Sequence, residues 1–246
     1  MQSQQHITSH AVVESLSNCK LARSCILLLS LLLLVTASTK ASTITWTTWT
    51  AATAGNPGSA TGTIGTVGVT YAGLVNYFYT SYPSWMPTST YAGGTVSNAP
   101  SPDNIIGLTG GAGTGTETVT FSTPVVDPVM SIWSLGAGGT TAQFVFSSSE
   151  PFAIEAGGPS AEYGGSSIYV GGTCPANAVC GAEGNGTIQF NGTFSSLTWT
   201  NPVYENWYGF DLGIAGVAST TTPEPASIVL LTTVLGIAGA LRRRTH

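Results

Sequence analysis

Short runs in which apolar residues alternate with small or polar residues recur through the central part of the chain. They include residues 67–71 and 208–214, where Val, Tyr, Phe, Leu and Ile occupy every second position. A period of two places successive side chains on opposite faces of a half-buried β-strand. The same region shows no sustained helical periodicity, so the sequence predicts an all-β fold.

Further strands are expected wherever such runs are bounded by Gly, Pro, Asn or Ser. The expected segments are 44–50, 74–79, 117–121, 129–135, 152–155 and 166–170. About ten short strands separated by turns are typical of a β-sandwich, and a jelly roll is one form that such a sandwich takes. We therefore expect one all-β passenger domain over residues 42–219.

Asn191-Gly192 joins two alternating segments, TIQF and TFSSLTW. Asn-Gly readily supplies the two positive-φ residues of a type I′ turn, so the sequence predicts a β-hairpin at this point. Phe194 and Leu197 are three positions apart, which predicts a β-bulge before Trp199.

Charge is unevenly distributed along the chain. The basic residues and histidines lie only in the two ends: His6, His10, Lys20, Arg23, Lys40, Arg242, Arg243, Arg244 and His246. Residues 41–241 thus lack the imidazole that a Ser-His-Asp triad or a histidine-ligated metal needs, and the cations that would clamp phosphates. Nucleotide and nucleic-acid binding are excluded on this basis.

Carboxylates, in contrast, are present throughout the passenger domain. They are Asp103, Glu117, Asp127, Glu150, Glu155, Glu162, Glu183, Glu205 and Asp211. With no cation to pair with, like charges repel, so we expect these side chains to be spread over the surface.

The N-terminus is organised as an export signal. A polar segment carrying Lys20 and Arg23 precedes the apolar run 25–35, and small residues follow. This order predicts a signal peptide over residues 1–41, cleaved by signal peptidase after residue 37 or 41. A buried core helix is the alternative.

The C-terminus has the features of a membrane anchor. Residues 226–241 are apolar except for one Ser and two Thr, and they run directly into Arg242, Arg243 and Arg244. We expect a single transmembrane helix over 226–241 and a basic cytoplasmic tail over 242–246, with the body outside the cytoplasm. Here too the alternative is a buried core helix.

Pro223, Glu224 and Pro225, in a linker over residues 220–225, precede that apolar span. The tripeptide, the span and the terminal arginine cluster together resemble the PEP-CTERM sorting signal of Gram-negative bacteria. The resemblance implies processing by an exosortase near the tripeptide, transient anchoring in the inner membrane, and a final place at the cell surface or outside the cell. Proteins of this class often belong to exopolysaccharide and biofilm systems.

Cys174 and Cys180 are the two cysteines that remain after signal removal. In an exported chain such a pair predicts a disulfide that closes a tight loop. A metal site would need further ligands that the region lacks, and a redox role would favour a CxxC spacing.

Aromatic residues are concentrated in the segment 77–91. Tyr79, Tyr82 and Trp85 are the candidates for a platform on which sugar rings stack. The alternative is that these rings cover one end of the sandwich core.

The expected function is that of an exported, non-enzymatic surface or extracellular-matrix protein without a required cofactor. One alternative is a carbohydrate-binding module for exopolysaccharide. A second is a glycoside-active enzyme that uses a pair of carboxylates. Calcium is the metal that oxygen ligands alone would bind, but the sequence contains no D-x-D loop, and Asp103 and Asp127 are better explained as turn residues.

Overall fold

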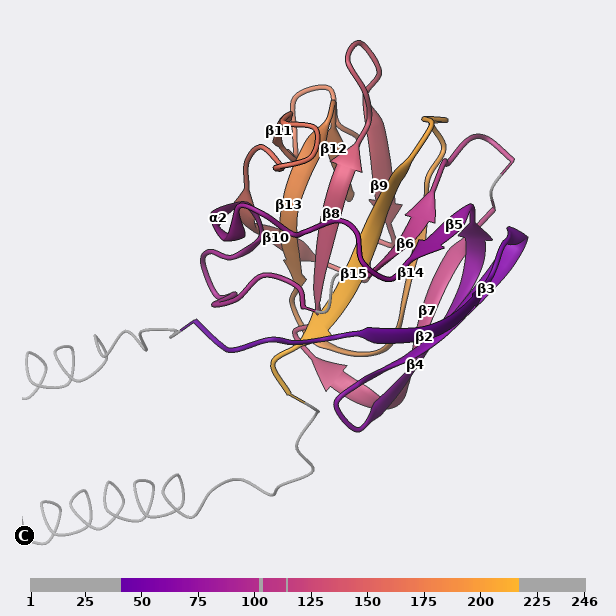
Figure 1. Ribbon diagram of the computed structural model, residues 1–246, viewed down its shortest axis with the longest axis vertical. Helices are drawn as coiled ribbons and strands as arrows, with labels where there is room; N and C mark the ends of the chain where they lie inside the picture. The colour runs from indigo at the N-terminus through magenta and orange to yellow at the C-terminus, as the bar shows by residue number, and fades with distance from the viewer. Residues whose placement is uncertain (1–40, 102–103, 114, 217–246) are drawn as a thin grey trace, which may run out of the picture. The chain divides into compact units, whose positions relative to one another are not determined.

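The computed structural model describes residues 41–101, 104–113 and 115–216 (Figure 1). The predicted signal peptide, the linker with Pro223, Glu224 and Pro225, the predicted transmembrane helix and Arg242, Arg243 and Arg244 lie outside these residues. None of the helices in the described ranges has the length and apolar character needed to cross a membrane.

Two β-sheets account for most of the described chain, as the sequence predicts. The first sheet contains β1 (Thr45–Trp46), β5 (Tyr77–Tyr79), β6 (Ile105–Leu108), β8 (Val129–Leu135), β10 (Phe152–Gly157), β11 (Ser166–Ser167), β13 (Gly184–Phe190) and β15 (Tyr208–Ile214). The second contains β2 (Thr48–Thr53), β3 (Gly55–Ile64), β4 (Val67–Val75), β7 (Glu117–Val126), β9 (Ala142–Phe146), β12 (Ala178–Gly181) and β14 (Thr193–Thr200). One short helix, α2 (Thr88–Tyr91), precedes β6.

The first sheet has the order β10-β13-β8-β15-β6-β5, with β1 also paired to β15 and β11 to β13. The second has the order β12-β9-β14-β7-β4-β3-β2. Neighbouring strands are antiparallel, except that β11 runs parallel to β13. The all-β prediction is confirmed, and two antiparallel sheets are consistent with the predicted sandwich.

Several segments expected to be single strands pass from one sheet to the other. The segment 44–50 contributes β1 to the first sheet and the start of β2 to the second, and 74–79 is divided in the same way between β4 and β5. Only Ser166–Ser167 of the expected strand 166–170 is a strand, whereas β8 has the expected bounds. Periodicity locates extended backbone but does not show where a strand changes sheet.

The predicted hairpin at Asn191-Gly192 is wrong. β13 lies in the first sheet and β14 in the second, so these residues carry the chain between sheets. The Asn191 N–H donates to the Pro151 carbonyl (2.8 Å) and the Gly192 N–H to Asp127 Oδ1 (2.7 Å), which replaces hairpin pairing with contacts to distant segments. The predicted bulge in this strand is confirmed, because the register of β14 against β7 shifts between Phe194 and Ser196.

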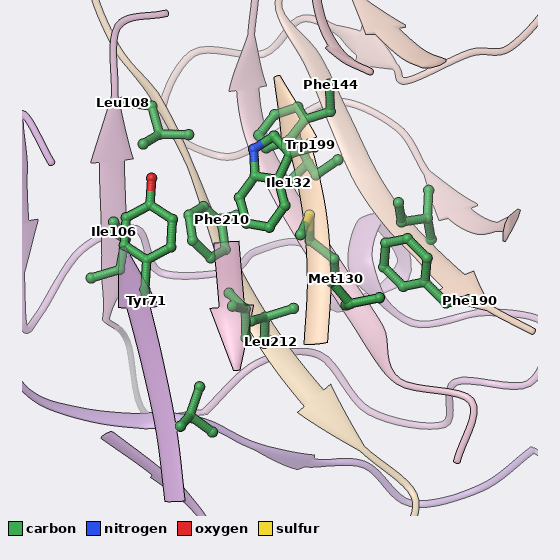
Figure 2. Close-up of a cluster of buried hydrophobic side chains, with 14 of the residues drawn as sticks. Tyr71, Ile106, Leu108, Met130, Ile132, Phe144, Phe190, Trp199, Phe210 and Leu212 are labelled. Carbon is green, nitrogen blue, oxygen red and sulfur yellow. The ribbon is translucent and has the colours of Figure 1, made fainter. Parts of the chain in front are cut away.

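The core lies between the two sheets and is rich in aromatic side chains (Figure 2). Phe210 of the first sheet packs against Trp199 and Tyr71 of the second, with ring centroids 5.2 and 5.3 Å apart. Burial of each such ring contributes about 2 to 3 kcal/mol to folding. Both sheets and this core are completed within residues 41–216, so we expect this fragment to fold on its own.

The expectation that carboxylates stay on the surface is wrong for four of them: Glu117 and Asp211 are fully buried, and Glu150 and Glu205 are nearly so. Glu117 Oε2 accepts hydrogen bonds from the Tyr71 hydroxyl (2.5 Å) and the Leu74 N–H (2.7 Å). Hydroxyl and N–H donors thus replace the missing cations.

Protonation further lowers the cost of burying these groups. Burial raises the pKa of Glu117 and raises that of Asp211 strongly, although the Leu212 N–H and the Trp49 indole donate to Asp211. A raised pKa favours the neutral carboxyl, and a neutral group neither repels its neighbours nor requires a buried counterion.

Candidate functional site

Two glycines shape the outer face of the first sheet, opposite the core. Ile106 and Leu108 point into the core, so Gly107 of β6 faces outward. A Cβ atom at Gly107 would overlap the ring of Tyr77, and one at Gly209 of β15 would overlap Ile105. The bare backbone of β6 thus leaves room for an aromatic ring to lie directly against the sheet.

Six aromatic rings meet on this face, and we call them the aromatic cluster: Tyr77, Tyr79, Tyr82, Trp133, Tyr163 and Trp207. Trp133 of β8 lies at its centre, with ring centroids 5.1 Å from Tyr82, 5.4 Å from Tyr163 and 6.2 Å from Trp207. Tyr77 extends the cluster through contacts with Tyr79 (4.7 Å) and Trp207 (5.9 Å).

The rings of the aromatic cluster differ in solvent exposure: one is buried and the others are partly exposed. Trp133 is fully buried, Tyr79, Tyr82 and Trp207 are half-buried, and Tyr163 is 43% exposed. Partly exposed aromatic rings can cover the C–H side of a sugar ring or attract a cation.

The three residues singled out from the sequence lie in or against one buried cluster that also contains Trp133, but they differ in exposure. Tyr79 and Tyr82 belong to the aromatic cluster, but Trp85 is only 1% exposed and packs against Tyr91 with ring centroids 5.0 Å apart. Trp85 is therefore not the exposed stacking ring that the sequence indicated, and the alternative that it covers a core describes it correctly.

The Cys174–Cys180 disulfide is present, which confirms the disulfide predicted from the sequence. It packs with Ala178 in a small apolar cluster of its own, against Val145 and Tyr169. It therefore contributes no group to the aromatic cluster.

Tyr163 is carried by a turn that two other segments hold in place. The Ser160 N–H donates to the Gly164 carbonyl (2.7 Å), which closes the turn, and Asn185 Nδ2 donates to the same carbonyl (3.2 Å). On the other side, Glu162 Oε1 accepts hydrogen bonds from the Ser84 N–H (2.7 Å) and hydroxyl (2.5 Å). The most exposed ring of the cluster thus stands on a fixed backbone.

Acidic side chains surround the rings. Glu205 is only 7% exposed, and its Oε1 accepts the Trp207 N–H (3.1 Å). Burial raises the pKa of Glu205 to about 7, and the charge of Glu183 adds to this effect. Burial also raises the pKa of Tyr82, with contributions from Tyr163 and from the charge of Glu162.

The backbone beneath the cluster is strained at two positions. Ser134 and Glu183 have φ values of 56° and 58°, in the left-handed region that side chains other than glycine rarely adopt. The Ser134 hydroxyl donates to Glu183 Oε2 (2.9 Å), and its N–H donates to Asn185 Oδ1 (2.8 Å). Such strain persists only where the surroundings impose it, and it concentrates at binding and catalytic sites.

Four buried polar atoms at the cluster have no hydrogen-bond partner within the described part of the chain. They are the Tyr77 hydroxyl, Trp133 Nε1, Glu162 Oε2 and Glu205 Oε2. Buried polar atoms are normally paired, so bound water or a ligand would supply partners here, as at five further unpaired atoms elsewhere in the described residues, among them Glu117 Oε1 and Asp211 Oδ2. Across residues 41–101, 104–113 and 115–216, no three His, Cys, Asp or Glu side chains are grouped so that they could hold a metal ion.

Trp133, Tyr163 and Trp207 were not identified from the sequence. For Trp133 a signal was present: the strand 129–135 places it on the same face as Ser131, opposite Met130 and Ile132. A Trp on the polar face of a strand indicates a second packing surface. Tyr163 and Trp207 lie in connecting segments, where no periodicity shows which way a side chain points.

Comparison with known proteins found no matching family model, no similar curated protein and no similar solved structure.

Proposed function

We propose that the chain is an exported, non-enzymatic surface or extracellular-matrix protein, sorted by a PEP-CTERM signal that an exosortase processes. The observation that carries this proposal is the order of Pro223-Glu224-Pro225, an apolar span and Arg242 to Arg244, combined with the predicted signal peptide. A disulfide in the passenger domain agrees with an oxidising destination.

The test is an intact-mass measurement on the protein recovered from the producing cell. We expect a chain that begins after residue 37 or 41 and ends near Pro225, without the apolar span. Recovery of the protein with Arg242, Arg243 and Arg244 still attached would overturn the sorting proposal.

For the passenger domain we propose a sandwich of the jelly-roll type. Support comes from its connections, because consecutive strands alternate between the two sheets from β6 to β10 and again from β12 to β15. Strand alternation of this kind is the connectivity that winds a jelly roll.

The second candidate function is carbohydrate binding, with exopolysaccharide as the partner, through the aromatic cluster. The observation that favours it is the set of accessible rings over buried, unpaired polar atoms: rings cover the C–H faces of sugars, and polar atoms bond their hydroxyls. Tyr163, Tyr82 and Trp207 replace Trp85 as the contact residues in this proposal.

Binding of the 41–216 fragment to matrix polysaccharide, measured by affinity electrophoresis, tests this role. We expect Tyr163→Ala to weaken binding about fivefold or more, since stacking of one ring contributes about 1 kcal/mol or more. Tyr204→Ala is the matched control, because Tyr204 is 62% exposed and its hydroxyl donates to Asn206. Hydrolysis of the polysaccharide that disappears in Glu205→Gln would instead support the enzymatic alternative.

A further inference from the structure

Three carboxylates lie at the aromatic cluster, and the described residues contain no Lys, Arg or His. Glu162 precedes Tyr163 directly and lies close enough to Tyr82 and Tyr91 to help raise the pKa of both hydroxyls, for which burial is the main cause. Glu205 has the same effect on Tyr77, where burial is again the main cause, and Glu183 lies near Glu205. Residues 41–241 contain no Lys, Arg or His that could offset these carboxylates.

The arrangement of rings and acids disfavours an anionic ligand. The face of an aromatic ring carries negative electrostatic potential, and a carboxylate nearby increases it. An acidic sugar would meet like charge without a cationic partner, which costs binding energy on partly desolvated surfaces. A ligand with an ammonium group would gain from both the rings and the carboxylates.

Two of the buried, unpaired atoms are carboxylate oxygens, Glu162 Oε2 and Glu205 Oε2. Glu205 is more than nine-tenths buried and, with a pKa of about 7, is mainly protonated in mild acid, whereas an ionised carboxylate only accepts hydrogen bonds. The partner that such oxygens lack is a donor, and an ammonium group carries three donors together with the compensating charge. The Tyr77 hydroxyl and Trp133 Nε1 supply the donors that sugar hydroxyls accept from.

We propose that the aromatic cluster selects carbohydrates that carry protonated amino groups, such as glucosamine polymers, over neutral and anionic ones. This proposal rests on the carbohydrate-binding function proposed above and assigns its ligand class. Sugar rings stack on Tyr163, Tyr82 and Trp207, and the amino groups interact with Glu162.

A pair of oligosaccharides that differ only in charge provides the test. The 41–216 fragment is titrated at pH 6 by calorimetry with a β-1,4-glucosamine hexamer and with the N-acetylglucosamine hexamer of the same linkage. We expect the charged hexamer to bind about fivefold tighter, which corresponds to one partly screened charge pair of about 1 kcal/mol. Raising the salt from about 0.05 M to about 0.5 M should remove most of that difference, because surface charge pairs are screened.

Two substitutions assign the effect to this site. Glu162→Gln keeps an oxygen to accept the Ser84 hydrogen bonds and removes the charge, so we expect affinity for the charged hexamer to fall about fivefold and affinity for the acetylated hexamer to stay unchanged. Glu155→Gln is the matched control: this half-buried carboxylate accepts the Thr95 N–H (2.7 Å) and should leave both affinities unchanged. Tyr163→Ala should weaken binding of both hexamers.

The possible outcomes separate the two proposals. If the two hexamers bind with equal affinity and Tyr163→Ala weakens binding of both, the charge selection is overturned but carbohydrate binding stands. Tighter binding of a uronic-acid hexamer than of the glucosamine hexamer would also overturn the charge selection. Failure to bind all three hexamers and matrix polysaccharide would overturn carbohydrate binding itself.

Discussion

Replacing the buried acid Glu205 with Gln should change how the stability of the fold depends on pH. Burial raises the pKa of Glu205 from its ordinary value of 4.5 to about 7. The folded state therefore binds the proton more tightly than the unfolded state, and this stabilisation is complete below pH 4.5. It is lost as the pH rises through 7, because the ionised carboxylate must then stay buried without a cation.

The pKa shift sets the magnitude. A difference between 4.5 and about 7 corresponds to about 3 kcal/mol of unfolding free energy, lost between roughly pH 4.5 and pH 8. Glu117 and Asp211 have raised pKa values as well, so their contributions have the same sign. The fold should thus be more stable in mild acid than at alkaline pH.

The assay is urea unfolding of the 41–216 fragment, followed by Trp fluorescence at several pH values from 4.5 to 8. The free energy of unfolding falls by about 2 kcal/mol per molar urea, so the loss of about 3 kcal/mol from Glu205 should lower the unfolding midpoint by about 1.5 M urea. The Glu205→Gln variant cannot titrate at this position. Between pH 4.5 and pH 8 its unfolding midpoint should therefore fall by about 1.5 M urea less than that of the wild-type protein.

Glu205→Asp serves as the control, since it retains a titratable carboxyl at the same position. An identical loss of midpoint in wild type and Glu205→Gln would refute the reasoning, and so would a wild-type fold that becomes more stable as the pH rises from 4.5 to 8.

Three further predictions concern the stability of the fold. Gly107→Ala should lower the free energy of unfolding, measured in urea, by about 1 to 3 kcal/mol, because the new Cβ atom would overlap the Tyr77 ring. Gly113→Ala is the control: its Cβ atom would meet no neighbouring atom, so we expect almost no change in stability. Equal effects of the two substitutions would contradict the packing argument. Cys174→Ser should lower the free energy of unfolding by about 2 kcal/mol, which is the loop-closure entropy of the short loop that the disulfide closes. If reductant left the thermal unfolding midpoint of the wild-type protein unchanged, this prediction would be contradicted. Asn185→Ala should lower the free energy of unfolding by about 3 kcal/mol and increase proteolysis in the turn 160–165, because the Asn185 amide forms hydrogen bonds with both that turn and β8. Unchanged cleavage in the turn would show that the amide does not hold it in place.

Much of the secondary structure could be predicted from local pattern. β8 begins and ends at the residues that alternation indicates, and the bulge in β14 follows from the three-residue spacing of Phe194 and Leu197. The disulfide follows from an isolated pair of cysteines six positions apart. Each of these features depends on residues close together in sequence.

The candidate site could be predicted only in part, because its members come from distant segments. Tyr79 and Tyr82 were identified as a local concentration of aromatic residues, but the same concentration includes Trp85, which is buried against Tyr91. The rings that complete the site, Tyr163 and Trp207, lie about 80 and 125 positions after Tyr82 in the sequence. Only strand pairing and the fixed turn at Ser160 bring them together.

The sequence by itself determined the fold class, through a side-chain period of two that any extended backbone imposes. It also determined the acidic, cation-free character of the passenger domain, since composition does not depend on folding. Tertiary structure decided which strands pair, and it placed Asn191-Gly192 between sheets because contacts with Asp127 and Pro151 outweigh a local hairpin turn. It likewise decided which carboxylates are buried, because donors such as the Tyr71 hydroxyl meet Glu117 only after β4 and β7 have paired.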